Sequence, residues 1–438
     1  MYQRTLSRAI REFIELHTRT RPVSNKKPSR QNKIALAECE FDYEYITNPV
    51  NRKQIENNIK HRKNVGDINR LLELDDQFRA EKCPGKRETL WQSLLTEANS
   101  LPNKTHPTVQ GYEGRPKVLK CSEHVVHSFL PKTFMELAKD LRLLRTEDLA
   151  TVTGSRSYYF IGDLAELEFA LIKFTISRLL KKNFNVVSVP DILPAEVLER
   201  CGMTQNSMQT QVYYLDETHG SNLCLSGTSE MALAALFSNT IFSSKELPTC
   251  VTAVSRCYRA EVSSIAEEKG IYRVHQFTKV EMFGISHPNE SEQMMQNFVD
   301  IQEEMFSSLG LDYQILDMPM HELGASAYRK HDIEAWYPGK EMYGEISSCS
   351  NCTDYQSRRL NIKYKDGDKL RHVHTVNGTA CAIPRMLMAL FETHQQQNGN
   401  IRLPEPLRPF LNGKEEIQLQ NVIPKLTSKV KESRKSSS

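Results

Sequence analysis

Apolar and polar positions alternate with a period of two on both sides of a charged segment in the second half of the chain. Between residues 252 and 284, apolar side chains such as Tyr258, Val274 and Val280 fall at even positions. This pattern predicts two antiparallel strands joined by a long polar loop at 263–270. The odd positions hold charged or titratable residues that would share one face: Arg259, Glu261, Arg273, His275, Lys279 and Glu281.

The charged face of this hairpin has two interpretations. It could be a solvated surface with ion pairs across the strands. Alternatively, its arginines could bind a polar ligand, because the guanidinium fork matches the oxygens of a phosphate group. The second interpretation predicts a phosphate-bearing ligand.

The surrounding segments predict further strands and helices in no simple βαβ order. Apolar spacing indicates helices over 134–144, 164–182, 230–237, 291–309 and 383–395, and strands over 153–163, 184–190, 312–318, 344–351 and 372–382. Asn377 and Gly378 predict a break in the last strand. This order favours an α+β domain with an antiparallel sheet. Neither GxGxxG nor GxxxxGK[ST] occurs, so a nucleotide would bind without those phosphate cradles.

The N-terminal quarter has a different character. Residues 1–35 are basic and amphipathic, which predicts a mitochondrial transit peptide, although Glu12 and Glu15 depart from that pattern and a basic tail or first helix is the alternative. Residues 51–101 predict a short helical hairpin, with Pro84 and Gly85 marking its break. Residues 111–130 are typical of a linker, and the polar segment 413–438 predicts a disordered tail.

Composition excludes only a few classes of protein. The chain has 438 residues and a net charge of +3, so any contact with nucleic acid must come from local patches. No apolar run approaches the roughly 20 residues that span a bilayer. Ten scattered cysteines favour a reducing compartment. Cys349 and Cys352 form the only close pair, which is weak evidence for zinc, and we expect no structural zinc.

Several dispersed phrases carry a resemblance to a known family. A strand that ends at Pro190, the hairpin over 259–277 and the segment 377–385 resemble motifs 1, 2 and 3 of the class II aminoacyl-tRNA synthetases. Within that class the chain resembles seryl-tRNA synthetase of the mitochondrial type. The specific phrases are GSRSYY at 154–159, GTSE at 227–230, GIYRVHQFTKVEM at 270–282 and EISSCSN at 345–351. The likeness covers residues 100–410, with a weaker match over 40–100.

The resemblance implies an architecture and a reaction. The expected fold is an antiparallel sheet of six to seven strands flanked by helices, with a truncated helical tRNA-binding arm at 40–105 and a catalytic domain at 106–412. The expected reaction joins serine to ATP as seryl-adenylate and then transfers the seryl group to tRNA(Ser). A dimer through motif 1, either with itself or with a paralogue, and a location in the mitochondrial matrix are also implied.

The resemblance also implies residues for ATP. Arg259 would bind the α-phosphate, Phe277 would stack on adenine, and Arg385 would lie on the other face of adenine near the γ-phosphate. Glu345 and Ser348 would hold Mg²⁺ through ATP, and Arg259, Glu345 and Arg385 would be catalytic. The full ATP-binding set is Arg259, Ala260, Glu261, Val274, His275, Gln276, Phe277, Glu345, Ile346, Ser347, Ser348 and Arg385.

A second set of residues would form the serine pocket. Glu281 would face the substrate ammonium, and Asn377 and Thr379 would read the hydroxyl, so that alanine is rejected because polar groups stay unpaired. The set is Thr228, Ser229, Glu230, Arg259, Glu281, Asn377 and Thr379. Simpler interpretations are that Thr228 or Glu230 only caps a helix and that 377–378 is only a turn.

Two departures from the family leave alternatives open. The arm is short, so tRNA would be held by another basic segment, by a partner subunit, or through an unusually reduced tRNA. Lys269 stands where arginine is common before the glycine, which keeps the charge but loses the fork. The main alternative to an active ligase is a catalytically silent paralogue that binds mitochondrial RNA or a sister subunit. A class II ligase for another amino acid is disfavoured by Thr228, Glu230 and Thr379.

Overall fold

The structure is a computed structural model that describes residues 36–62, 64–123, 126–146, 149, 152–203, 211–216, 218, 222–261 and 270–420. The predicted transit peptide at 1–35 lies outside the described residues. So do positions 263–269 of the predicted hairpin loop, including Lys269, and residues 421–438 of the predicted tail.

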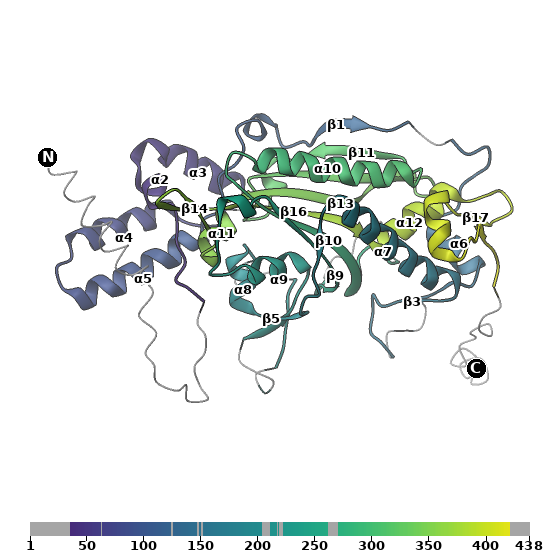
Figure 1. Ribbon diagram of the computed structural model, residues 1–438, viewed down its shortest axis with the longest axis horizontal. Coiled ribbons are helices and arrows are strands. Elements are labelled where there is room, and N and C mark those ends of the chain that lie inside the picture. Colours follow the sequence, from purple (N-terminus) through teal and green to yellow (C-terminus); the bar gives the residue numbers. More distant parts are fainter. Residues whose placement is uncertain are drawn as a thin grey trace, which may run out of the picture.

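An eight-stranded sheet forms the centre of the molecule (Figure 1). Every neighbouring pair in it is antiparallel except β4 and β9, which are parallel. This confirms the α+β fold with an antiparallel sheet flanked by helices, and the strand number exceeds seven because β1 and β4 lengthen the two edges. In spatial order the strands are β1 (Lys117–Cys121), β11 (Tyr313–Asp317), β12 (Arg329–Tyr337), β13 (Met342–Thr353), β16 (His374–Ala382), β10 (Gln276–Ser286), β9 (Thr249–Tyr258) and β4 (Asn185–Val186).

Two hydrophobic cores lie on opposite faces of β10. Val280 and Met282, at even positions, join the larger core, which is completed by α6 (Phe134–Asp140), α7 (Asp163–Lys181), α10 (Ser291–Ser308) and α12 (Ile383–His394). Phe283 and Ile285, at odd positions, pack in a second core with α8 (Ala195–Arg200), α9 (Ser229–Leu236) and α11 (Tyr355–Leu360). The face of β10 that carries the odd-numbered residues is therefore exposed to a polar environment over Phe277–Glu281, and α9 covers the rest of it.

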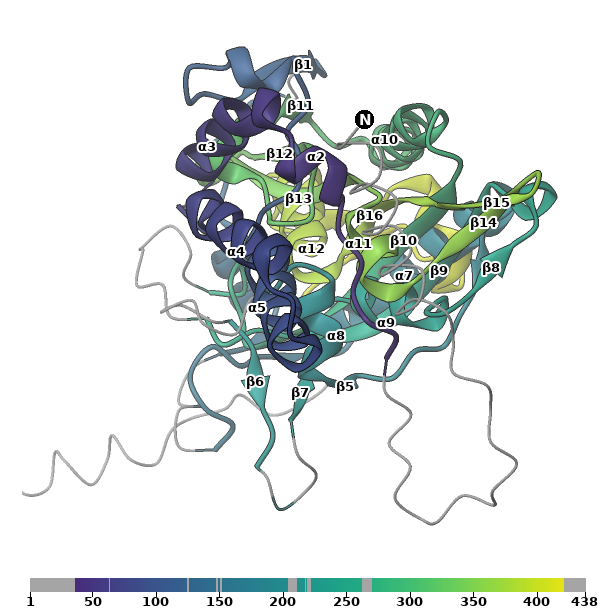
Figure 2. The same ribbon diagram turned by 90° about the vertical axis from the view of Figure 1, so that its left-hand side faces the viewer.

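The N-terminal helices form a separate projection at one end of the molecule (Figures 1 and 2). They are α2 (Tyr43–Thr47), α3 (Arg52–His61), α4 (Ile68–Ala80) and α5 (Pro84–Ser100). Phe78, Trp91 and Leu94 fill the interface between α4 and α5. Pro84 begins α5 instead of stopping a helix, because the first helical position needs no backbone N–H donor. The predicted helical hairpin is confirmed.

Small sheets and single turns complete the fold. The short strands are β2 (Leu144–Arg145), β3 (Tyr159–Phe160), β5 (Ile192–Pro194), β6 (Tyr213–Tyr214), β7 (Leu223–Leu225), β8 (Ile241–Phe242), β14 (Lys363–Asp366), β15 (Lys369–His372), β17 (Ile401–Arg402) and β18 (Glu416–Ile417). The 3₁₀ turns are η1 (Pro49–Asn51), η2 (Val109–Gly111), η4 (Ser244–Glu246), η6 (Met320–Glu322) and η7 (Glu405–Leu411). Because β18 pairs with β17, regular structure continues beyond residue 412.

Several local predictions differ from the structure. The strands expected at 153–163 and 184–190 are present only as β3 and β4, of two residues each. The expected linker at 111–130 contains β1, which pairs with β11. The expected break at 377–378 is wrong, because β16 runs through it and Gly378 is there for space: a Cβ would lie 3.3 Å from Gln302 Nε2. Arg259 and His275 lie just beyond the ends of β9 and β10, although the Arg259 N–H still donates to the His275 carbonyl at 3.0 Å.

Candidate active site

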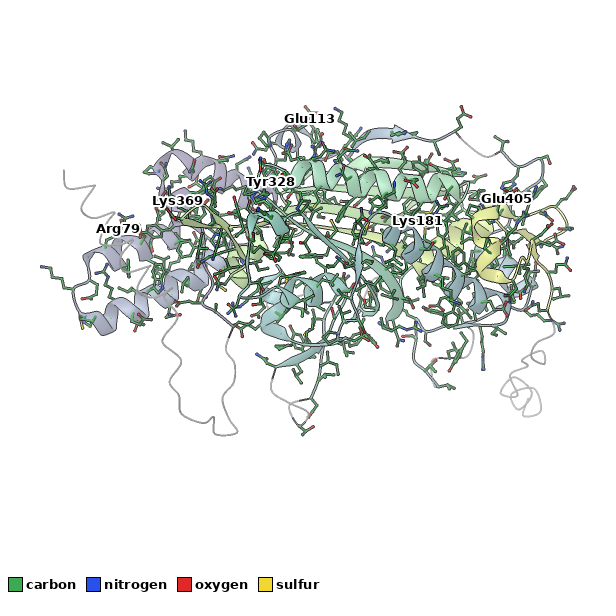
Figure 3. The ribbon with its side chains drawn as sticks, viewed as in Figure 1. Arg79, Glu113, Lys181, Tyr328, Lys369 and Glu405 are labelled. Carbon is green, nitrogen blue, oxygen red and sulfur yellow. The ribbon has the colours of Figure 1, made fainter. Side chains whose placement is uncertain are left out.

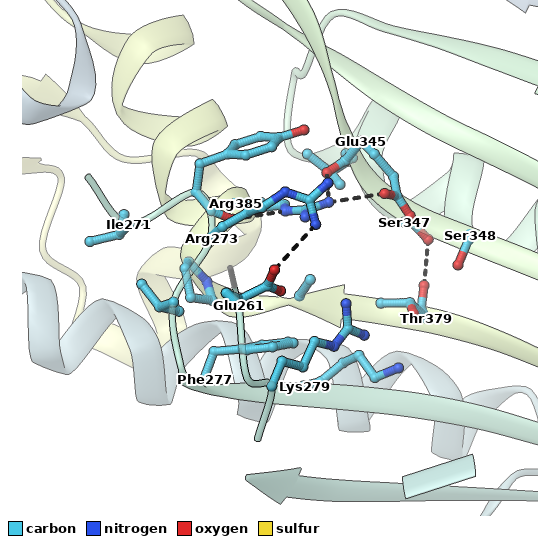
Figure 4. Close-up of a pocket in the computed structure, with 16 residues that line it drawn as sticks. Glu261, Ile271, Arg273, Phe277, Lys279, Glu345, Ser347, Ser348, Thr379 and Arg385 are labelled. Atoms are coloured by element: carbon cyan, nitrogen blue, oxygen red, sulfur yellow. Dashed lines mark hydrogen bonds and ion pairs between the residues drawn. The ribbon is translucent and has the colours of Figure 1, made fainter. Parts of the chain in front are cut away.

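A polar pocket opens where β9 ends and β10 begins, opposite β13 and the start of α12 (Figure 4). It encloses about 600 Å³ of empty space, part of it open to solvent. A β-bulge at Ile346 on β13 and another at Ala380 on β16 offset the strands beside it. Many of the residues predicted to bind ATP line it, together with one serine-pocket residue: Arg259, Glu261, Val274, Phe277, Glu345, Ile346, Ser347, Ser348, Arg385 and Thr379.

Arg385 and Glu345 form an ion pair on one wall of the pocket. Arg385 lies in the first turn of α12, and its Nη1 is 3.1 Å from the Glu345 carboxylate and 2.8 Å from the Glu345 carbonyl oxygen. Its Nε donates to the Tyr272 carbonyl at 3.3 Å, and its guanidinium lies 4.3 Å from the centre of the Tyr272 ring. Burial alone would raise the pKa of Glu345, but Arg385 and the Lys330 ammonium lower it to about 2. Glu345 is therefore ionised at neutral pH.

Arg259 lies on the facing wall and has no acidic partner among the described residues. Its guanidinium carbon is 5.2 Å from the centre of the Phe277 ring, and its Nε donates to the Gly227 carbonyl at 3.4 Å. No carboxylate within the described part of the chain lies within 4 Å of it, whereas Arg273 is 3.7 Å from Glu261. The charge of Arg259 is thus available to an anion that enters the pocket.

A buried carboxylate lies deeper along the same face of β10. Glu281 is 2% exposed. It accepts a hydrogen bond from Thr228 Oγ1 at 3.3 Å and forms an ion pair with Lys279. Thr228 also caps α9, because its Oγ1 accepts from the Glu230 N–H at 3.3 Å. The capping interpretation of Thr228 is correct, and the same side chain nevertheless contacts the predicted pocket.

Glu230 and Asn377 meet beside this carboxylate. Asn377 Nδ2 donates to Glu230 Oε1 at 3.1 Å, and Gln356 Nε2 donates to the same oxygen at 2.7 Å. Burial and the neighbouring charge of Glu281 raise the pKa of Glu230 to about 7, although Lys279 and the Gln356 hydrogen bond oppose the shift. The structure therefore brings five of the predicted serine residues into one cluster, namely Thr228, Glu230, Glu281, Asn377 and Thr379, the last paired with Glu281 across β10 and β16.

A few predicted residues lie outside the pocket. His275 Nδ1 is 2.7 Å from the Tyr213 hydroxyl, and Gln276 is exposed. Ser229 is buried, and its hydroxyl has no hydrogen-bond partner within the described part of the chain. Ala260 also lies outside the pocket lining and donates its N–H to the Gln211 carbonyl. The predicted roles of these four residues in binding ATP or serine stay predictions.

Two pocket cations lie on the charged face that the period of two predicts, but the sequence pattern indicated no role for them. These are Arg273, which pairs with Glu261, and Lys279, which pairs with Glu281. The period of two already put Lys279 between Phe277 and Glu281, so the signal was present. Gln356, which holds Glu230 from α11, had no such signal because it is 126 residues away in sequence.

The comparisons with known proteins agree with this geometry. Residues 213–394 match the family model described as the tRNA synthetase class II core domain (G, H, P, S and T). The fold and the site are thus those of a class II aminoacyl-tRNA synthetase catalytic domain. The chain is 44% identical to a mitochondrial serine–tRNA ligase of Mus musculus over 74% of this chain and 63% of that protein. It is 40% identical to the Bos taurus counterpart over 79% of this chain and 70% of that protein.

A solved structure shows the same likeness. The crystal structure of seryl-tRNA synthetase from Pyrococcus horikoshii complexed with ATP superposes with a TM-score of 0.76 at 28% identity, covering 87% of this chain and 100% of that one. The chain belongs to the serine–tRNA ligase family, the seryl-tRNA synthetases. It spans just under two thirds of the mouse relative's length.

The described residues contain neither a membrane-spanning helix nor a metal-binding cluster. No helix among them combines the length and the apolar character needed to cross a membrane. No group of three or more His, Cys, Asp or Glu side chains among them is arranged to hold a metal ion.

Proposed function

We propose that this chain activates serine with ATP and transfers the seryl group to tRNA(Ser). The observation that supports this most directly is the placement of the Thr228–Glu281 cluster beside the pocket lined by Arg259 and Arg385. An ammonium group and a triphosphate could be bound in adjoining sites there. The names of the two mammalian relatives, and the ATP in the Pyrococcus horikoshii structure, favour the same reaction.

ATP would be held by charge and by stacking. Arg259 is the candidate for the α-phosphate, because it faces the pocket with no carboxylate partner among the described residues and would stabilise charge that develops in the transition state. Phe277 and Arg385 are the candidates for the two faces of adenine. Adenine would have to displace the guanidinium of Arg259 from the Phe277 ring, which costs a cation–π contact of about 0.5–2 kcal/mol.

Glu345 and Ser348 fit the requirements of a magnesium ion that arrives with ATP. Both line the pocket, and the low pKa of Glu345 keeps it an anionic oxygen donor. Mg²⁺ takes one or two protein oxygens and completes its shell with water and phosphate. Bound there, the ion would supply neutralisation of phosphate charge, while Arg385 would keep the Glu345 carboxylate in place.

We propose that the arm at 40–105 contacts tRNA and that 106–412 is the catalytic domain. The arm is bound to the body through side chains that reach backbone carbonyls: Arg62 donates to the Gly324 carbonyl, and Asn103 donates to the Ser326 and Cys352 carbonyls at 2.8 Å each. Arg79 of α4 belongs to the arm, and Lys369 of β15 lies toward the same end of the molecule (Figure 3). Phosphate contacts dominate nucleic-acid affinity, so basic side chains at this end would compensate for a short arm.

A dimer is supported by an apolar surface around motif 1. Phe169 and Leu180 of α7 are 61% and 53% exposed, and Val186 of the edge strand β4 is 51% exposed. Exposed apolar patches of this kind mark protein interfaces. We propose that a second copy of this chain or a paralogue covers them, and sedimentation of the purified protein alone should show twice the monomer mass if the dimer is homotypic.

A mitochondrial location is supported by the names of the two mammalian relatives. The basic, amphipathic character of residues 1–35 favours import to the matrix. Localisation of the full chain carrying a C-terminal fluorescent tag, compared with a version lacking residues 1–35, would test this part of the proposal.

Serine-dependent exchange of pyrophosphate into ATP by the purified full chain tests the reaction. We expect exchange with serine and none with alanine, because alanine leaves the pocket's polar groups unpaired. A folded sample that binds tRNA but shows no exchange would support the silent paralogue instead.

Arg259→Ala should abolish exchange, because the developing phosphate charge loses its stabilising cation.

A further inference from the structure

Lys279 is a buried lysine that faces the pocket. It is 6% exposed and lines the pocket beside Phe277 (Figure 4). The period of two along β10 puts Glu281 on the same face, and Glu281 forms an ion pair with Lys279. Its neighbours in register, Ser255 on β9 and Ala382 on β16, are small and uncharged. A lysine this deep needs a partner for its charge, and Glu281 is the only carboxylate within ion-pair distance among the described residues.

The contacts of Glu281 leave one of its oxygens available. Lys279 and Thr228 both contact Oε2, and no contact of Oε1 occurs within the described part of the chain. An amino-acid ammonium could therefore bind Oε1 without displacing Lys279. Glu281 would then lie between two cations in a buried position, and this arrangement requires a further negative charge next to Lys279.

The carboxylate of the amino acid supplies that charge. It is separated from the ammonium nitrogen only by the α-carbon, so an amino acid whose ammonium lies on Oε1 can place its carboxylate beside the Lys279 ammonium. We propose that Lys279 and Glu281 together bind the zwitterion of the substrate, with Lys279 binding the carboxylate of serine. This inference rests on the proposed function and adds a substrate-binding residue to it.

The role fits the chemistry of activation. A carboxylate oxygen of serine attacks the α-phosphorus of ATP, a C–O–P bond forms, and the bond from that phosphorus to the bridging oxygen breaks. Pyrophosphate leaves with the electron pair, and no proton is transferred. Arg259 would draw the α-phosphate toward the pocket while Lys279 fixes the direction of the attacking carboxylate, which is positioning of the two reactants.

Binding of serine and of L-serinamide, which lacks the carboxylate, separates this role from a structural one. Calorimetry is done on the full chain with Mg²⁺ and α,β-methylene-ATP, which cannot release pyrophosphate. For Lys279→Met we expect serine affinity to fall about 10-fold to 100-fold, as for loss of a charge-assisted hydrogen bond, and serinamide affinity to fall less than about 3-fold. Lys279→Arg should retain the preference for serine, and Lys365→Met, at an exposed lysine, should behave as wild type.

Two results would overturn the proposal. Equal losses for serine and serinamide in Lys279→Met would mean that Lys279 only holds Glu281 in place, and unchanged serine affinity would mean that it has no part in binding. If Lys279→Met does not fold, Lys279→Met combined with Glu281→Gln removes both buried charges and is compared with Glu281→Gln alone. The proposal then requires a further loss of about 10-fold for serine only.

The same samples distinguish this proposal from the proposed function. Wild-type protein that exchanges pyrophosphate while Lys279→Met retains full serine affinity contradicts only the role of Lys279. Wild-type protein that binds neither serine nor serinamide and shows no exchange contradicts the ligase itself.

Discussion

At the scale of single residues, the geometry of the pocket depends on the hydrogen bonds that each arginine side chain makes. Arg385 makes three directed contacts from one planar group: to the Glu345 side chain, the Glu345 carbonyl and the Tyr272 carbonyl. Lysine keeps the charge but cannot hold three acceptors in one plane. For Arg385→Lys we expect kcat/KM for ATP in pyrophosphate exchange to fall at least about 10-fold. Arg402→Lys, at an exposed site, is the matched control, and equal activity of the two variants would contradict this role.

The shifted pKa of Glu230 makes a second residue-scale prediction. Burial raises its pKa from the usual 4.5 to about 7, so the folded state binds the proton more tightly than the unfolded state. The stabilisation this gives is present below pH 4.5 and is lost as the pH rises through 7. Glu230→Gln, which is neutral throughout, should therefore gain stability relative to wild type by about 1–3 kcal/mol between about pH 5 and about pH 8. Thermal unfolding at several pH values measures this, and a pH-independent difference would refute it.

At the scale of elements, α10 holds the strands that form the pocket floor. The side-chain nitrogen of Gln302 lies 2.8 Å from Ser347 Oγ, 3.0 Å from the Ser348 carbonyl and 2.9 Å from the Thr379 carbonyl. These acceptors belong to β13 and β16, at the point where both strands are bulged. The pocket geometry therefore depends on a helix that contributes no residue to its lining.

Removal of the Gln302 amide tests this dependence. Gln302→Met keeps the volume but removes the side-chain donor from the Ser348 carbonyl, whereas the Thr379 carbonyl still accepts from the Ser347 hydroxyl; the loss should cost about 1–3 kcal/mol of unfolding free energy. Exchange activity should fall at the same time, because Ser348 and Thr379 lose a common support. Gln296→Met, on the exposed side of α10, should change neither quantity by a measurable amount. Loss of stability with full activity would show that the strands hold their positions without α10.

Most elements followed from local pattern, and the exceptions have physical reasons. The stripe of Leu164, Leu167 and Leu171 predicted α7 because one side of that helix packs against the core. Strand β1 gave no signal because all five of its residues are exposed, so no alternation of burial marks it. The strand through Gly378 was read as broken because the requirement there is the approach of α10, which is distant in sequence.

The candidate site was predictable to different degrees for its different parts. Residues on one strand, such as Phe277 and Glu281, share a face by the period of two and could be grouped from the sequence. The pairing of Arg385 with Glu345 and of Asn377 with Glu230 joins segments that are 40 and 147 residues apart. Only the resemblance to a family brought those residues together before the structure did.

At the scale of the whole molecule, the proposed contact of the arm with tRNA requires that the arm be held at a fixed angle to the catalytic domain. Arg62 at the end of α3 is 3% exposed and donates to the Gly324 carbonyl in the body and to the Asn103 carbonyl at the end of the arm. Asn58 also donates to the Asn103 carbonyl, at 2.7 Å, and the Asn103 side chain donates to the Ser326 carbonyl of the body at 2.8 Å. The junction is therefore polar and directional, unlike the apolar contact between α4 and α5.

Loosening this junction should separate the two steps of the reaction. For Arg62→Met we expect pyrophosphate exchange to stay within about 2-fold of wild type, while kcat/KM for tRNA falls about 10-fold, as for loss of about 1.4 kcal/mol of binding energy. Lys60→Met, an exposed neighbour on α3, is the control. A parallel loss of exchange would mean that the arm supports the catalytic domain instead of the RNA.

The balance of charges in the pocket has a consequence for the order in which its ligands arrive. Among the described residues, the lining contains four cations, Arg259, Arg273, Lys279 and Arg385, but only two carboxylates, Glu261 and Glu345. A bare divalent cation entering first would meet repulsion from this excess, whereas a triphosphate would be attracted. The metal should therefore enter already bound to the nucleotide. Mg²⁺ added without ATP should leave the melting temperature of the protein unchanged.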